Sequence, residues 1–218
     1  MAIPKVIYQT FKTSKIPWIT RLYIWNFMRK NRSYSYEFYD DARIDSFIKS
    51  NFDEEVYNAY TKLQIGAAKA DFFRYAILYI KGGVYLDLDS DILVSLDTVL
   101  NEDDVAVITH EGYHKDLYVQ WGLVYDKGHP FLKRTLDYIV DNINNRRHLH
   151  DVHALTGPTV YTKAVNDCLL EDPSIKHRVL GYDYDGMMQF KYKLGKLFIY
   201  GNRKLHWKKL QKEITVIK

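Results

Sequence analysis

The hydrophobic and polar positions of this chain follow two periods, and their alternation predicts an α/β fold. "KVIYQTF" (residues 5–11) follows Pro4 and is rich in β-branched and aromatic residues, which predicts a first strand. Apolar residues recur with a period near 3.6 over residues 64–81, which is typical of a helix. Gly82 and Gly83 follow this segment and predict its end, because glycine suits the turn past a helix C-terminus.

The rest of the chain continues the alternation. Further strands are expected over residues 34–40, 84–89, 104–110 and 119–125, with a short one near 197–201; further helices over 18–32, 41–60 (one or two), 130–144, 156–170 and the C-terminal end. Asp45 and Asp53 are candidate helix caps. With no repeat and no linker in the pattern, we expect a single α/β domain over residues 1–218.

The composition is typical of a globular protein and also indicates its cellular compartment. Hydrophobic residues make up 47% and charged residues 27% of the 218 positions, which is ordinary for a soluble domain. The single cysteine, Cys168, excludes an internal disulfide and fits a reducing compartment. The start lacks the apolar core of a signal peptide, and no apolar run approaches the ~20 residues of a membrane span. A cytoplasmic location is therefore expected.

The net charge of +4 is unevenly placed. Between Met187 and Lys218 there are nine basic residues and one acid, Glu213. Such a segment suits the phosphates of a nucleotide, a membrane surface or a nucleic acid, although a solvated face explains most of the lysines equally well. A nucleic-acid partner is the least favoured, because the basic residues show no aromatic stacking motif. Peripheral membrane contact through this C-terminal segment stays open.

The stretch "IKGGVYLDLDSDI" (residues 80–92) places three carboxylates directly after a hydrophobic run. If the strand continues, Asp87, Asp89 and Asp91 lie on one of its faces, because alternate residues of a strand point the same way. Carboxylate oxygens suit hard cations such as Mn²⁺ and Mg²⁺. The spacing therefore predicts a divalent-cation site at the end of the strand.

Other interpretations of this acidic run differ in how well the sequence fits them. An EF-hand loop fails, because its sixth and twelfth positions would be Ile92 and Thr98 instead of Gly and Glu. A haloacid-dehalogenase-like, metal-dependent phosphatase, with the first Asp as nucleophile, remains the alternative enzyme, and an acidic turn without function remains open. The chain contains neither a P-loop nor a dinucleotide-binding glycine pattern.

The helix before the acidic run carries two charged residues on an otherwise apolar surface. Asp71 and Arg74 are spaced i, i+3 and so share one helix face. A buried carboxylate and guanidinium must be paired or bound to a polar ligand. They therefore form either an internal ion pair or a site with the donors and acceptors that sugar hydroxyls need.

Together these residues resemble a known family. The pattern A-D-x-x-R-Y-x-x-L-Y-x-x-G-G-x-Y-x-D-x-D is matched at eleven fixed positions over residues 70–89, and it resembles the DXD-containing, sugar-binding segment of family 32 glycosyltransferases and of the related glucosylating clostridial toxins. The opening "IPKVIYQTFK" is similar to the first strand of that family, with Tyr8 and Phe11 as departures. "WG" (121–122), "HP" (129–130) and "TGP" (156–158) follow in family-like order.

The resemblance implies a glycosyltransferase A-type (GT-A) fold, with a Rossmann-like mixed sheet flanked by helices. Residues 1–110 would bind the nucleotide-sugar and residues 111–218 would face the acceptor. The implied activity moves a hexose or deoxyhexose from a nucleotide-sugar, most often UDP-linked, to a hydroxyl of a glycan acceptor with retention of configuration, as in polysaccharide or glycoprotein glycan biosynthesis. A carbohydrate- or nucleotide-binding module without turnover is the non-enzymatic alternative.

The resemblance also implies a role for each matching residue. Asp89 would ligate Mn²⁺ or Mg²⁺, and Asp87 would contact both the metal and the ribose. Asp71 and Arg74 would hydrogen-bond hydroxyls of the donor sugar, and Tyr85 would lie near the diphosphate or the sugar. The remaining expected contacts are Tyr8, Gln9 and Thr10 beside the base and His206 as a late metal or phosphate ligand.

Overall fold

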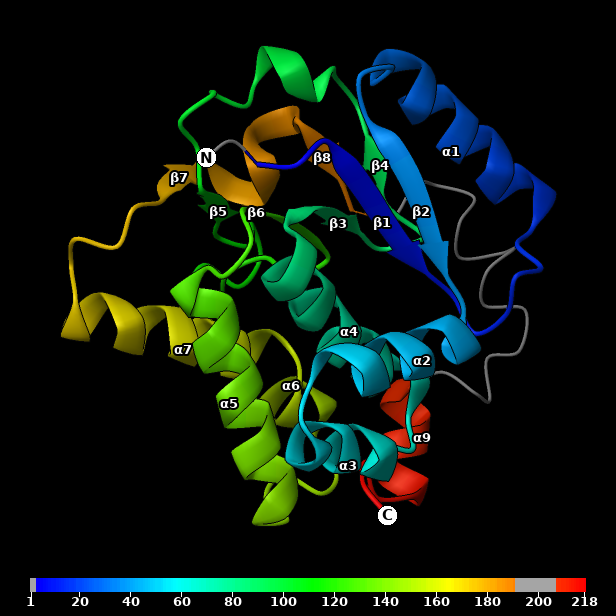
Figure 1. Cartoon of the computed structure of the whole chain (residues 1–218), viewed down its shortest axis with the longest axis vertical. Helices are drawn as coiled ribbons and strands as arrows, with labels where there is room; N and C mark the ends of the chain where they lie inside the picture. Colours follow the sequence, from blue (N-terminus) through cyan, green and yellow to red (C-terminus); the bar gives the residue numbers. More distant parts are fainter. Residues whose placement is uncertain (1–2, 191–206) are drawn as a thin grey trace.

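A six-stranded sheet forms the centre of the molecule, for which a computed structural model describes residues 3–190 and 207–218. The strand order is β2-β1-β3-β6-β5-β7. Strand β1 pairs in parallel with β2 and β3, and β5 pairs in parallel with β7, whereas β6 is antiparallel to both β3 and β5. The fold is therefore the expected α/β arrangement with a mixed central sheet flanked by helices (Figure 1).

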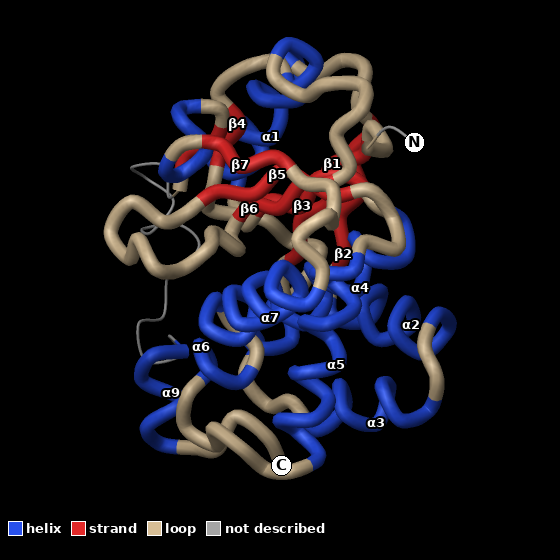
Figure 2. The backbone as a smooth tube through the Cα atoms, turned by 90° about the vertical axis from the view of Figure 1, so that its left-hand side faces the viewer, coloured by secondary structure: helices blue, strands red, loops and turns tan. Residues whose placement is uncertain are grey.

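The elements have the following bounds. The strands are β1 Val6–Thr10, β2 Ser35–Tyr39, β3 Gly83–Leu86, β4 Asp91–Ile92, β5 Ala106–Thr109, β6 Gly122–Tyr125, β7 Arg178–Leu180 and β8 Met188–Gln189, of which β4 and β8 form a separate pair. The helices are α1 Trp18–Lys30, α2 Asp41–Asn51, α3 Glu54–Lys62, α4 Gly66–Lys81, α5 Pro130–Asn144, α6 Val152–Leu155, α7 Pro158–Glu171 and α9 Trp207–Glu213. Figure 2 shows α1 on one side of the sheet and the other labelled helices on the opposite side.

The strands divide their side chains between two hydrophobic cores. In β3, Val84 and Leu86 belong to the core shared with α1, while Tyr85 between them belongs to the core shared with the other helices. Strand β6 repeats this alternation at Leu123 and Val124. Because successive strand residues point to opposite faces, the near-continuous apolar runs of the sequence reflect a sheet that is covered on both sides.

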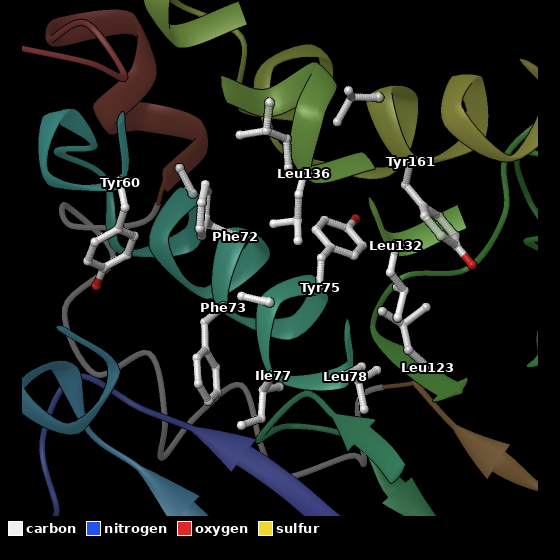
Figure 3. Close-up of a cluster of buried hydrophobic side chains, with 14 of the residues drawn as sticks. Tyr60, Phe72, Phe73, Tyr75, Ile77, Leu78, Leu123, Leu132, Leu136 and Tyr161 are labelled. Carbon is white, nitrogen blue, oxygen red and sulfur yellow. The ribbon is translucent and has the colours of Figure 1, made fainter. Parts of the chain in front are cut away.

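Helix α4 lies at the centre of the larger core. Phe72, Phe73, Tyr75, Ile77 and Leu78 are all fully buried. Figure 3 shows these side chains between neighbouring helices and the sheet. This helix also carries Asp71 and Arg74, so the packing of the core fixes the position of both charged groups.

Most of the predicted elements are present, with small shifts at their ends. The segment 41–60 forms two helices, which are capped by the side chains of Asp40 and Asp53. The expectation for Asp45 is wrong, since it lies inside α2 and accepts a hydrogen bond from the Tyr57 hydroxyl. The sequence did not indicate α6, β7 or the β4–β8 pair, and the strand expected near 197–201 lies outside the described residues.

The strand before the acidic run is shorter than predicted. It ends at Leu86, opposite Gly122 at the start of β6, and a turn follows in which the Ser90 backbone N–H donates to the Asp87 carbonyl at 2.9 Å. The expectation that Asp87, Asp89 and Asp91 share one strand face is therefore wrong, because the sheet ladder stops before the first of them.

No helix among the residues with described coordinates is both long enough and apolar enough to cross a bilayer.

Gly83 is the residue whose backbone the sheet constrains most clearly. It has φ of +115°, and a Cβ placed on it would lie 2.8 Å from the Val6 carbonyl oxygen. We expect Gly83→Ala to lower the free energy of unfolding by about 1–3 kcal/mol, measured by urea denaturation. Gly66→Ala is the matched control, because a Cβ there meets nothing within 4 Å, and it should leave stability unchanged or slightly raised. Equal losses in the free energy of unfolding for Gly83→Ala and Gly66→Ala would contradict the backbone constraint at Gly83.

Candidate functional site

A cavity of about 1420 Å³ opens where strands β1 and β3 end. The sequence-predicted residues that line it are Thr10, Asp71, Arg74, Tyr85, Asp87 and Asp89. The cavity wall is completed by residues from distant parts of the chain, including Gln120, Trp121, His153 and Trp207. The fold therefore brings the α4 charges and the acidic turn into one pocket, as the sequence suggested.

Arg74 is the centre of a buried charge cluster. Its Nη2 lies 2.8 Å from Asp87 Oδ1 and 3.2 Å from Asp71 Oδ1, and its Nη1 donates to the Gln120 carbonyl at 3.1 Å. The guanidinium also lies over the Tyr85 ring, 5.0 Å from its centroid. Burial alone would lower the pKa of Arg74, but Asp87, Tyr85 and Asp71 raise it above its ordinary value. The group therefore stays charged, and its buried Nε has no hydrogen-bond partner.

Asp71 depends on partners that are far away in the sequence. The Thr156 hydroxyl donates to its Oδ2 at 2.9 Å, and Gln120 Nε2 donates to its Oδ1 at 3.4 Å. Burial raises the pKa of Asp71 to about 7, against the opposing effects of Arg74 and the Thr156 hydroxyl. Because the folded pKa lies above the unfolded one, the contribution of this carboxyl to stability falls as the pH rises toward 7.

Gln120 and Thr156 are site residues that the sequence reasoning missed. The Tyr75 hydroxyl donates to Gln120 Oε1 at 2.6 Å, which leaves the amide nitrogen to face Asp71. Gln120 thereby connects both α4 charges to the segment before β6. The "TGP" stretch is part of the family resemblance and begins a predicted helix, but the sequence assigned no role to Thr156, which is a direct partner of Asp71.

Asp87 is held from several directions at once. Its Oδ1 accepts hydrogen bonds from Arg74 Nη2 and from the Tyr85 hydroxyl at 3.0 Å, and its backbone N–H donates to the Trp121 carbonyl. Gln9 Nε2 donates to the Asp87 carbonyl at 3.1 Å. The turn that carries the first acidic residue is thus fixed before any ligand binds.

The three residues expected beside the base have different positions. Thr10 lines the cavity, but Tyr8 is almost fully buried in the helix-side core and Gln9 supports the turn at Asp87. Neither Tyr8 nor Gln9 is among the cavity-lining residues. Tyr8 and Gln9 are both buried, so the first strand supports the site and its last residue, Thr10, lines the cavity.

The acidic residues differ in their access to the cavity. Asp89 lines it beside Asp87, whereas Asp91 begins β4 and does not line it. Within residues 3–190 and 207–218 no cluster of three or more His, Cys, Asp or Glu side chains could hold a metal. His206 lies outside the described residues. The described part of the chain therefore offers two carboxylates, a set that fits a hard cation whose other ligands come from substrate and water.

Aromatic pairs form part of the cavity wall. Trp121 and Phe190 stack with ring centroids 5.3 Å apart, and His153 and Trp207 stack at 5.2 Å. All four residues line the cavity. Flat aromatic surfaces of this kind suit the faces of a nucleobase or a sugar ring.

Comparison with known proteins gives a consistent result. Residues 11–106 match the family described as the glycosyltransferase sugar-binding region containing a DXD motif. The chain is 45% identical over 89 residues to the uncharacterized glycosyltransferase L373 of Acanthamoeba polyphaga mimivirus, covering 40% of this chain and 36% of that protein. It is 29% identical over 199 residues to the initiation-specific alpha-1,6-mannosyltransferase of Schizosaccharomyces pombe, covering 77% and 49%.

A third relative is the inositol phosphoceramide mannosyltransferase 3 of the same yeast, with 32% identity over 134 residues that cover 60% of this chain and 35% of that protein. The chain thus spans half or less of the length of these curated relatives. Among solved structures, the PaToxG glycosyltransferase superposes with a TM-score of 0.64 at 20% identity, over 79% of this chain and 71% of that one. The UDP-bound glycosyltransferase domain of the YGT toxin gives 0.60 at 9% identity, over 86% and 80%.

The Thr156 hydrogen bond gives a test of the charge cluster. We expect Thr156→Val to lower the free energy of unfolding by about 1–3 kcal/mol, because Asp71 loses a donor in a buried position. The loss should be larger at about pH 9 than at about pH 5, since the hydroxyl stabilises the ionised form of Asp71. Urea denaturation at both pH values measures it.

The control for this change is Thr61→Val, which removes a hydroxyl that bonds only to the Asn58 carbonyl near the surface of α3. It should change stability by less than about 0.5 kcal/mol at either pH. A pH-independent loss in Thr156→Val would show that Asp71 does not depend on this hydroxyl.

Proposed function

Because the chain belongs to the glycosyltransferases whose sugar-binding region contains a DXD motif, we propose that it transfers a hexose from a nucleotide-sugar to a hydroxyl of a glycan acceptor. This is the family that residues 70–89 predicted from the sequence, and the prediction is confirmed. The observation that carries the proposed activity is the meeting of Asp71, Arg74, Asp87 and Asp89 in one cavity.

Mannose is the donor sugar that we propose first, because the two yeast relatives described above are named mannosyltransferases. A UDP-bound toxin domain of the same fold supports a uridine nucleotide, and a guanosine nucleotide is the competing carrier. The stacked rings of Trp121 and Phe190 offer the flat surface against which a base or sugar would lie.

The role of a metal follows from the charges of the site. Mn²⁺ or Mg²⁺ held by Asp87 and Asp89 would neutralise the negative charge that develops on the diphosphate as the sugar leaves. These residues fit, because a cation of this kind is usually bound by one or two carboxylates together with substrate phosphates. His206 remains a proposed further ligand.

Asp71 and Arg74 are proposed to bind hydroxyls of the donor sugar. Both lie in the cavity wall, and Arg74 has an unpaired Nε–H. A sugar that loses its diphosphate becomes oxocarbenium-like, so hydrogen bonds that fix the ring favour the reaction. Retention of anomeric configuration is part of the proposal, with the acceptor hydroxyl attacking on the face that the diphosphate leaves.

We propose that residues 1–110 mainly bind the donor and that residues 111–218 mainly face the acceptor. Asp71, Arg74, Asp87 and Asp89 belong to residues 1–110, while Gln120, Trp121 and Trp207 add to the cavity wall from residues 111–218. Of the nine basic residues in the C-terminal segment, four lie in the described part, and one of them, Lys208, lines the cavity. We therefore assign Lys208 to the phosphates of the donor.

The alternatives receive less support. A phosphatase of the haloacid-dehalogenase type needs Asp87 as a free nucleophile, but two donors hold its Oδ1. Hydrogen bonds to a carboxylate weaken it as an attacking group. A binding module without turnover would keep donor affinity and lack transfer, which a product assay distinguishes.

Asp89 provides the test of metal-dependent binding. We expect Asp89→Asn to abolish the Mn²⁺-dependent rise in melting temperature that a UDP- or GDP-sugar produces, because one charged ligand is lost. Asp91→Asn makes the same change two residues later, outside the cavity, and should keep the full shift. If Asp89→Asn also keeps it, the metal role of Asp89 is wrong.

Arg74 provides the test of sugar recognition. Arg74→Lys keeps the positive charge but loses the planar, multidentate geometry of the guanidinium. We expect it to weaken the binding of a nucleotide-sugar by about tenfold or more, which corresponds to ~1.4 kcal/mol. The binding of the free nucleoside diphosphate should weaken much less. Calorimetric titration measures both, and Arg178→Lys, at the Asp104 pair, is the control. Equal losses for the two ligands would assign Arg74 a structural role alone.

A further inference from the structure

Helix α1 presents an unusual face to the outside of the molecule. Trp18, Leu22 and Trp25 are 65%, 51% and 61% exposed. Their spacing of i, i+4 and i+7 places them on one side of the helix. Arg21 and Arg29 are also exposed and fall on the same side, and Arg29 lies over the Trp25 ring at 5.1 Å from its centroid. These five residues are called the α1 face below.

The α1 face is separate from the packing that holds the helix in place. On the opposite side Phe27 is fully buried, and Ile24 and Met28 pack against the core between α1 and the sheet. Figure 1 shows α1 at the outer edge of the molecule. Since the inward side already anchors the helix, folding does not explain the exposure of Leu22 and Trp25, which indicates a contact with something else.

The charged residues of the α1 face, Arg21 and Arg29, are both basic. No acidic residue precedes Glu37 in the sequence. Six basic residues lie between positions 12 and 32, namely Lys12, Lys15, Arg21, Arg29, Lys30 and Arg32. A surface that combines tryptophan, leucine and arginine without acids matches an anionic lipid bilayer, where aromatic rings lie at the headgroup level and basic groups meet lipid phosphates.

We propose that the α1 face binds the surface of an anionic membrane. The helix has 13 residues, so it lies along the bilayer at a length of about 20 Å and does not cross it. This assigns the membrane contact to the N-terminal part of the chain, whereas the sequence had pointed to the C-terminal basic segment. The inference does not depend on the proposed transferase activity.

The position of the α1 face relative to the cavity gives the contact a consequence. Residues 11–17 connect β1 to α1, and the first two of them, Phe11 and Lys12, line the cavity. A membrane bound at α1 would therefore be connected by this short segment to residues of the cavity wall. An acceptor hydroxyl carried on a lipid headgroup would be presented there without leaving the bilayer.

Other occupants fit the α1 face less well. A second copy of the chain would bring two sets of arginines together, and like charges at an interface are unfavourable. A single-stranded nucleic acid would match the basic groups and the rings, but an exposed leucine between the two tryptophans contributes nothing to such binding. Both remain as outcomes that the experiment can detect.

The experiment is co-sedimentation of the full chain with vesicles of phosphatidylcholine alone and of an equal mixture of phosphatidylcholine and phosphatidylserine. We expect binding to the mixed vesicles, weakened by salt. Leu22→Glu should reduce the partition coefficient by about tenfold or more, because an apolar contact becomes a like-charge repulsion with the lipid. Arg21→Gln and Arg29→Gln should each reduce it by about fivefold.

The matched control is Leu170→Glu, at a leucine of α7 that is 81% exposed, and it should bind the mixed vesicles as the unmodified chain does. Circular dichroism confirms that each variant is folded, and nucleotide-sugar binding by Leu22→Glu should be unchanged, since Leu22 does not line the cavity. The proposal is overturned if the unmodified chain stays in the supernatant, if Leu22→Glu binds normally, or if both leucine variants lose binding equally. A dimer that Leu22→Glu dissociates, or binding to an oligonucleotide but not to vesicles, would also overturn it.

Discussion

The buried guanidinium of Arg74 lies between the carboxylates of Asp71 and Asp87, and the rest of the site depends on this charge cluster. Arg74 pairs with both Asp71 and Asp87, and Asp89 adds a further acid to the same cavity. Burying charges is favourable only when each is paired and hydrogen-bonded. Burial is the main cause of the raised pKa of Asp71, and the nearby charge of Asp87 adds to it. Carboxylate oxygens gathered in this way suit an added hard cation.

The helix that carries this cluster is also the centre of the hydrophobic core. Nine residues of α4, including Asp71 and Arg74, are buried. The apolar contacts of Phe72 and Phe73 offset the desolvation of the neighbouring charges and prevent them from turning to solvent. The site is therefore rigid on the α4 side, so a ligand enters a preformed geometry and loses less entropy on binding.

The sequence predicted what is local and missed what is long-range. The i, i+3 pair on α4, the glycine turn and the acids after β3 are neighbours along the chain, so spacing alone revealed them. Gln120 and Thr156 lie 49 and 85 residues from Asp71, and neither belongs to a motif with a recognisable chemistry. The sequence likewise did not indicate that Thr10 lines the cavity while Tyr8 and Gln9 do not, because the period of a strand covered on both sides does not show which of its residues lies at the site.

The acidic cavity and the basic α1 face lie at opposite ends of residues 11–17, and their charges have different consequences for an anionic donor. The basic surface attracts any polyanion, lipid or nucleotide alike, because its field is unselective. In the proposed function, Asp87 and Asp89 in the cavity wall would oppose a bare diphosphate, whereas Lys208 in the same wall would favour it. A divalent cation would cancel the charges of both acids, so in the proposed function Asp87 and Asp89 would favour a metal-bound nucleotide, and Arg74 would favour a ligand that carries the sugar.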